Sequence, residues 1–227
     1  MSPAADPAPP ARWDAIVVAG GRASRLGGID KTALLWHGRS LLAGVVAAAS
    51  GSERSTGLVC VVGSAADLSP AVLRTVESPR WGGPAAAIVA GLAALAQART
   101  AQPPAPSWVL VLAADLLRPA QAVAALAAAI DALPASTAVE AVVTVDSAGA
   151  RQPLLAAYRM DALSRAADAL ATAENAPVKR LIGALTVLEV PVPDAHSADV
   201  DTPADAARVG IDLPDVAAAP APVDPTG

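Results

Sequence analysis

Short apolar runs of strand length alternate along the chain with longer stretches of helical composition. The runs are rich in valine and leucine and are bounded by glycine, proline or polar residues, as buried strands are. They cover residues 15–19, 58–63, 73–76, 108–115, 139–145, 154–158 and 186–190. Helices are expected over 41–50, with Ser40 as the cap, and over 85–97, 120–133, 161–172 and a segment that starts at 177. This alternation predicts an α/β fold in three layers, α/β/α, around a mostly parallel sheet.

The first strand leads into the most unusual stretch of the chain, residues 14–31, with the sequence DAIVVAGGRASRLGGIDK. Glycine pairs at 20–21 and 27–28 accompany the cations Arg22, Arg25 and Lys31. Glycines let backbone N–H groups approach a ligand closely, and cations offset the charge of phosphate oxygens. The stretch therefore indicates a polyphosphate site, although a glycine-rich, basic surface turn is the simpler alternative.

Two common phosphate-binding loops do not fit this spacing. No window of the stretch supplies the G-x-G-x-x-G pattern of dinucleotide-binding folds. A Walker loop requires glycine directly before lysine, whereas Ile29 and Asp30 separate Gly28 from Lys31.

Asp115 follows the apolar run that begins at Trp108. Open α/β sheets bind ligands at the carboxyl ends of their strands, and Mg²⁺ prefers carboxylate and phosphate oxygens. Asp115 is therefore a candidate magnesium ligand. The alternative is that Asp115 caps the helix that follows it.

A second acidic segment, DVDTPAD, spans residues 199–205. In an extended segment Asp199 and Asp201 point the same way, so that both can face one metal ion. Alternatively, Thr202 and Pro203 begin a helix with Asp205 in its first turn.

The pattern A-G-G-x-x-x-R-L-G-G-x-D-K over residues 19–31 resembles the signature loop of the MobA-like nucleotidyltransferase family. Molybdenum cofactor guanylyltransferase belongs to this group, and the resemblance extends over about residues 14–209. It implies a Rossmann-like nucleotide-diphospho-sugar transferase fold, with one antiparallel strand in the C-terminal half. One nucleotidyltransferase domain over 13–212 is expected, between disordered tails at 1–12 and 213–227.

The resemblance assigns roles to particular residues. Arg25, Lys31 and Asp115 would act in catalysis, and Mg²⁺ would be held by Asp115, Asp199 and Asp201. The nucleotide would be bound by Ala19, Gly20, Gly21, Lys31, Glu77, Gly83 and Asp115. Glu77 stands where the family usually has aspartate, and a solvated loop carboxylate is the alternative. The chain departs from the family at Ala87, which replaces a glycine, and at Pro119, which is displaced from D-x-P.

The activity implied by the resemblance is transfer of GMP from GTP to the phosphate of Mo-molybdopterin, with release of pyrophosphate. Only the A-G-G start and Gly83-Pro84 favour guanine. A cytidylyl or sugar-phosphate nucleotidyltransferase, or a non-catalytic nucleotide-binding accessory protein, remains an alternative. On the acceptor side, the resemblance points to Arg151, for which a hairpin turn is an equal explanation, and to Lys179 and Arg180. Molybdoenzymes or other proteins of cofactor biosynthesis are the implied partners.

Composition and charge argue against several classes of protein. The net charge of −5 argues against a nucleic-acid binder. The sequence shows neither a long, charge-free apolar run nor a secretory leader, so a cytoplasmic protein without a membrane segment is expected. Cys60, the single cysteine, is expected in the core, and His37 and His196 in a surface turn and a solvated loop.

Overall fold

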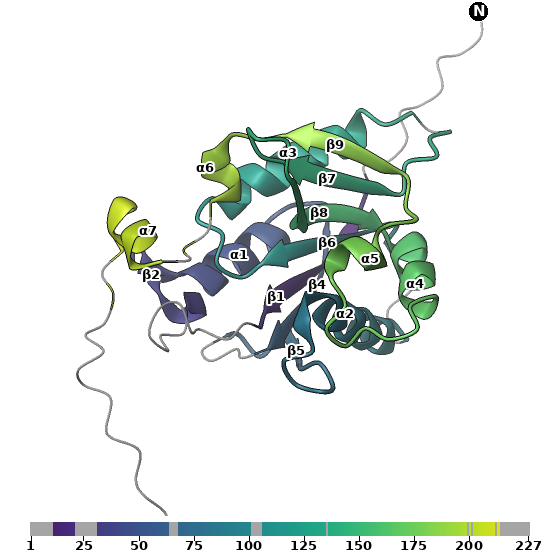
Figure 1. The fold of residues 1–227 in the computed structure, drawn as a ribbon, viewed down its shortest axis with the longest axis horizontal. Coiled ribbons are helices and arrows are strands. Elements are labelled where there is room, and N and C mark those ends of the chain that lie inside the picture. The colour runs from purple at the N-terminus through teal and green to yellow at the C-terminus, as the bar shows by residue number, and fades with distance from the viewer. Residues whose placement is uncertain are drawn as a thin grey trace, which may run out of the picture.

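The computed structural model describes residues 11–20, 31–63, 68–100, 106–134, 136–198, 200, 202–211 and 213. These residues form a three-layer α/β/α domain, in which helices cover both faces of a central sheet (Figure 1). The predicted fold class is therefore confirmed. The expected tails, apart from residues 11, 12 and 213, and residues 21–30 of the glycine-rich stretch lie outside the described residues.

Within the described residues, the central sheet has seven strands in the order β5–β4–β1–β6–β8–β7–β9. All neighbouring strands pair in parallel except β8, which is antiparallel to both β6 and β7, as the family resemblance implied. The strands are β1 (Trp13–Ala19), β4 (Ser55–Gly63), β5 (Leu73–Thr75), β6 (Trp108–Ala113), β7 (Ala141–Val145), β8 (Arg151–Arg159) and β9 (Val187–Pro191). A separate hairpin pairs β2 (Leu35–Trp36) with β3 (Arg39–Ser40).

Helices α1 and α3 pack on one face of the sheet, and α2, α4 and α5 on the other (Figure 1). Their bounds are α1 (Leu41–Ser50), α2 (Gly83–Arg99), α3 (Pro119–Asp131), α4 (Met160–Asp168) and α5 (Val178–Leu181), followed by α6 (Asp194–Ser197) and α7 (Pro203–Arg208). The Ser40 side chain accepts a hydrogen bond from the amide of Ala43, so the predicted cap of α1 is confirmed. Helix α4 ends at Asp168, earlier than the predicted residue 172.

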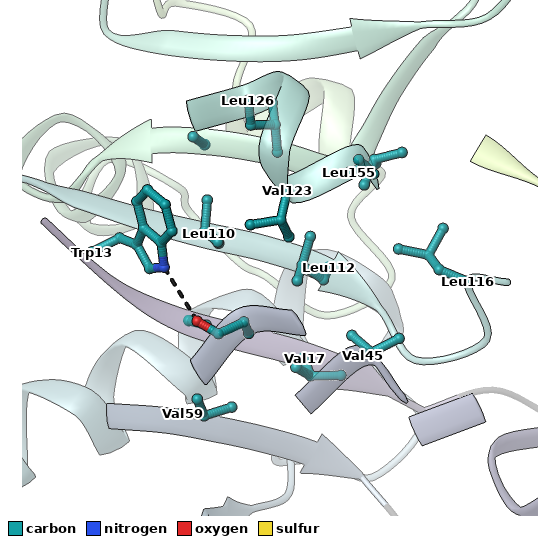
Figure 2. Packing of buried hydrophobic residues seen from close by; sticks show 14 of the residues in the cluster. Trp13, Val17, Val45, Val59, Leu110, Leu112, Leu116, Val123, Leu126 and Leu155 are labelled. Atoms are coloured by element: carbon teal, nitrogen blue, oxygen red, sulfur yellow. Dashed lines mark hydrogen bonds between the residues drawn. The ribbon is translucent and has the colours of Figure 1, made fainter. Parts of the chain in front are cut away.

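Alternating side chains of the central strands fill two cores. In β1, Trp13, Ala15 and Val17 face α1 and α3, whereas Ile16 and Val18 face α2. A strand buried on both faces must be apolar at successive positions, which explains the unbroken run in the sequence. Figure 2 shows the first core, in which the Trp13 indole donates a hydrogen bond of 3.2 Å to the carbonyl of Ala49.

One buried ion pair lies at the amino end of β1. The Asp14 carboxylate is fully buried and accepts a hydrogen bond of 3.0 Å from Nε of Arg99, at the end of α2. The Arg99 Nη2 and the Thr56 hydroxyl also donate to Asp14. A buried carboxylate is tolerated because these donors replace its water shell. The apolar pattern of β1 gave no sign of this pair.

Cys60 lies in β4 and is completely buried, as predicted. Burial raises the pKa of the Cys60 thiol from about 9 to about 11, because the thiolate would lose its hydration. The thiolate is the reactive form, so at pH 8 the native protein should react with a disulfide reagent such as DTNB at least roughly a hundredfold more slowly than the urea-unfolded chain. Absorbance of the released thiolate measures both rates. Equal rates would show that β4 opens readily in the native state.

Among the described residues, no helix combines the length and the apolar character that crossing a membrane requires.

Candidate functional site

The carboxyl end of β1 consists of small residues. Ala19 is partly buried and Gly20 is exposed, and the parallel neighbour β4 ends beside them at Gly63. Gly63 has a φ of +119°, and a Cβ at this residue would lie 2.8 Å from the carbonyl carbon of Ala19 and from the amide nitrogen of Gly20. Only glycine can follow this path, since any side chain would displace the end of β1. Gly63 is thus a supporting residue that the sequence pattern did not single out.

Lys31 and Asp115 are brought together at this edge of the sheet. Lys31 begins a short 3-10 helix (Lys31–Ala33), and Asp115 lies in the turn that follows β6. The Lys31 Nζ lies 3.9 Å from Oδ2 of Asp115, and both side chains are about one-fifth exposed. The two groups therefore form an ion pair that solvent and a ligand can reach.

Asp115 does not cap the helix after it. Helix α3 begins at Pro119, its N-cap residue is Arg118, and no side chain caps it. The alternative explanation for Asp115, a helix cap, is therefore wrong. The turn is instead fixed through its backbone, because the amide of Ala114 donates to the carbonyl of Val18.

Glu77 lies behind the end of β1. Its side chain is buried, with 6% exposed, and its Oε1 accepts a hydrogen bond of 3.0 Å from the amide of Trp81. A Cβ added to Gly20 would lie 3.6 Å from the same oxygen, so Glu77 also borders the glycine-rich stretch. Glu77 is therefore not the solvated loop carboxylate that was the alternative. It holds the loop before α2 against the end of β1.

Gly83 begins α2 with a φ of +85°, two residues before the predicted start at residue 85, and Pro84 occupies the first turn. The carbonyl of the preceding Gly82 accepts a hydrogen bond from the amide of Asn175, which ties the start of α2 to the segment before α5.

The acidic segment near the C-terminus begins a helix, as one of the two interpretations predicted. The Thr202 hydroxyl accepts from the amide of Asp205, and the Asp205 carboxylate accepts from the amide of Thr202, which is a capping box. Val200 is completely buried against Leu117, two residues after Asp115. The positions of Asp199 and Asp201 themselves lie outside the described residues.

Gly21 and Arg25 also lie outside the described part of the chain. Within that part, no cluster of three or more histidine, cysteine or acidic side chains is arranged to hold a metal ion. Of the candidate residues that the structure describes, two pairs therefore lie close together: Lys31 with Asp115, and Glu77 with Gly20.

The remaining candidates are the cations on the acceptor side and the two histidines. The Arg151 Nε donates to Glu189 at 2.7 Å, across β7 on the edge strand β9. Lys179 and Arg180 are exposed on α5. His37 is an exposed turn residue, as predicted. The expected solvated loop for His196 is wrong, because His196 lies in α6 with its Nδ1 buried.

A partly exposed cation beside a carboxylate, at the edge where β1 runs into a glycine, can hold a phosphate group and a divalent ion together. The Asp115 carboxylate can thus serve as a metal ligand, and the Lys31 ammonium group can offset the charge of a nucleoside triphosphate.

Solved structures with this fold include several nucleotidyltransferases. Rv0371c from Mycobacterium tuberculosis H37Rv superimposes with a TM-score of 0.60 at 23% identity, over 88% of this chain and 98% of that one. Molybdopterin-guanine dinucleotide biosynthesis protein A from Archaeoglobus fulgidus gives a TM-score of 0.57 at 18% identity, over 86% and 96%. The 2-C-methyl-D-erythritol 4-phosphate cytidylyltransferase of Francisella tularensis gives 0.60 at 12% identity, over 88% and 98%. At these identities the likeness shows the fold.

No curated protein matches the sequence significantly. A family model, described as the MobA-like NTP transferase domain, matches residues 15–188, which span β1 to β9 and include Lys31, Glu77 and Asp115. The chain therefore belongs to the family of MobA-like NTP transferase domains.

Proposed function

We propose that this protein transfers GMP from GTP to the terminal phosphate of Mo-molybdopterin, in the cytoplasm, and passes the dinucleotide product to molybdoenzymes or other proteins of cofactor biosynthesis. The observation that supports the transfer most directly is the Lys31–Asp115 pair, 3.9 Å apart at the carboxyl end of β1 and β6. A cation and a carboxylate at that edge suit the two halves of a magnesium–triphosphate ligand.

In this reaction an oxygen of the acceptor phosphate attacks the α-phosphorus of GTP in line. The new P–O bond forms as the bond to pyrophosphate breaks, so the protein supplies no covalent nucleophile. Lys31, together with Arg25, offsets the negative charge that builds on the α-phosphate and on the departing pyrophosphate. The backbone amides of Gly20 and Gly21 would orient the phosphates, and positioning would account for much of the rate.

The donor set at Asp115 fits a magnesium ion. Mg²⁺ is commonly held by one or two carboxylates together with substrate phosphates and water, and the Asp115 oxygens are partly exposed beside the phosphate site. Asp115 would hold the ion, with Asp201 and Asp199 as further ligands. When bound, the ion neutralises phosphate charge and strengthens the electrophilic character of the α-phosphorus.

Related transferases differ in the nucleotide base that they use and in the acceptor that they modify. The A-G-G start of the loop and Gly83-Pro84 favour guanine, and one neighbour of the same fold is named for molybdopterin-guanine dinucleotide biosynthesis. Other neighbours are named as a cytidylyltransferase and a CTP transferase, so CTP is the competing donor.

Thermal unfolding with each nucleotide tests the donor. A ligand at about 100 times its Kd stabilises the native state by about 2.7 kcal/mol, which corresponds to a rise in Tm of roughly 5–10 °C for a domain of this size. We expect this rise with GTP and Mg²⁺, and a much smaller rise with CTP or ATP, or with GTP and EDTA.

Release of pyrophosphate on addition of molybdopterin then tests the transfer. Stabilisation by CTP in place of GTP would contradict the guanylyl assignment. Stabilisation by GTP with no pyrophosphate would favour a nucleotide-binding accessory protein instead.

A further inference from the structure

A small third core lies beside the candidate site and joins segments that are distant in the sequence. Its buried members are Leu34, Leu41, Leu117, Val200, Ala206 and Ile211, with Trp36 and Val209 packed against them. Leu34 follows Lys31 by three residues, and Leu117 follows Asp115 by two. Val200, Ala206, Val209 and Ile211 belong to the C-terminal arm, by which we mean the described residues between Ala198 and Leu213. The arm thus contacts both sides of the Lys31–Asp115 pair.

Two hydrogen bonds fasten the arm to these two sides. On the Asp115 side, the amide of Leu117 donates to the carbonyl of Ala198 at 3.2 Å. On the Lys31 side, the Trp36 indole Nε1 donates to the carbonyl of Val209 at 3.2 Å. Helix α7 and strand β2 accordingly lie side by side at one end of the molecule (Figure 1).

Trp36 is the residue that contacts all three segments. It lies on β2, five residues after Lys31, and it holds the arm through Val209. The guanidinium of Arg118, three residues after Asp115, lies 6.0 Å from the centre of the Trp36 ring, within reach of a cation–π interaction. Lys31 and Asp115 are on separate loops, so a contact that spans both loops fixes their separation.

We infer that Trp36 is a positioning residue, which locks the C-terminal arm against the loops of Lys31 and Asp115 and so sets the geometry in which they receive magnesium and nucleotide. This role rests on the proposed function. Trp36 acts through the two loops and not by contact with the substrate. Docking of the arm and binding of the nucleotide should therefore be coupled.

Trp36→Phe tests this role with a small change. Phenylalanine keeps the aromatic face near Arg118 and the apolar packing, but it removes the N–H that the Val209 carbonyl accepts. We expect the Kd for GTP and the Mg²⁺ concentration for half-maximal activity to rise two- to tenfold, the range that corresponds to one lost hydrogen bond. Calorimetry measures the first quantity. Hydrogen exchange in peptides that cover residues 202–211 should become faster in the variant, with or without nucleotide.

Trp13→Phe is the matched control. Trp13 also donates an indole hydrogen bond of 3.2 Å to a backbone carbonyl, that of Ala49, but it lies at the amino end of β1, away from the site. This variant should lower the stability of the domain and leave the Kd for GTP and the exchange of the arm unchanged.

The outcomes separate the two proposals. Absence of GTP binding by the wild-type protein would overturn the proposed function, and the role of Trp36 with it. If the wild type binds GTP and Trp36→Phe binds it equally well, only the positioning role is overturned. The same holds if the arm of Trp36→Phe exchanges at the wild-type rate, or if Trp13→Phe raises the Kd as much as Trp36→Phe does.

Discussion

Replacement of Asp115 by asparagine should lower kcat for pyrophosphate release by about a hundred- to a thousandfold. Asparagine keeps the size and one oxygen of the side chain but removes the charge that a magnesium ion requires. The attraction between residue 115 and Lys31, now 3.9 Å apart, is lost as well. Steady-state assays with saturating Mg²⁺ and GTP measure the change.

The fold should survive this substitution. The Asp115 side chain is partly exposed, and partly exposed ion pairs contribute little to stability, about 0–1 kcal/mol. Asp131→Asn is a suitable control, because it removes another ion-paired carboxylate, on α3, at a distance from the site. Activity of Asp115→Asn close to that of the wild type would remove Asp115 from the metal site.

Replacement of Arg99 by methionine should lower the free energy of unfolding by about 3–5 kcal/mol. The Asp14 carboxylate would remain buried at the start of β1, with its guanidinium partner gone. Urea titration followed by circular dichroism measures the loss. Arg165→Met removes two ion pairs of an exposed arginine, with Glu140 and Asp161, and should cost less than about 1 kcal/mol.

A double variant keeps this test decisive even if Arg99→Met does not fold. Asp14→Asn combined with Arg99→Met removes both charges and leaves no unpaired ion in the interior. It should therefore recover part of the lost stability. If the double variant is no more stable than Arg99→Met, then the lost packing of the arginine stem, and not the unpaired carboxylate, accounts for the effect.

The sequence predicted those parts of the fold that depend on local patterns. Val17 and Val111 belong to apolar runs that only a strand buried on both faces explains, and Ser40 stands where a helix cap is required. The family resemblance added the antiparallel β8. Lys31 and Asp115 both follow strands of the sheet, and their proximity agrees with the general rule that parallel strands end at the same edge.

Other features depend on contacts between distant segments, which local patterns do not contain. Asp14 and Arg99 are 85 residues apart, and each alone resembles a surface charge. Gly63 resembles any glycine at a strand end until its neighbour Ala19 is placed beside it. No local pattern marks a helix around His196, so a solvated loop was expected there, whereas the structure places His196 in α6.

The reversed direction of β8 bears on how acceptor preference can diverge in such a domain. Because β7 and β8 run in opposite directions, a tight turn over residues 146–150 joins them at the edge where the parallel strands end. Asp146 closes this turn by accepting hydrogen bonds from the amides of Ala148 and Ala150. Lengthening a surface turn of this kind costs little, since the paired strands on either side keep their register. Under the proposed function, insertions at this corner can add contacts to the acceptor while β1, β4 and β6 keep their pairing.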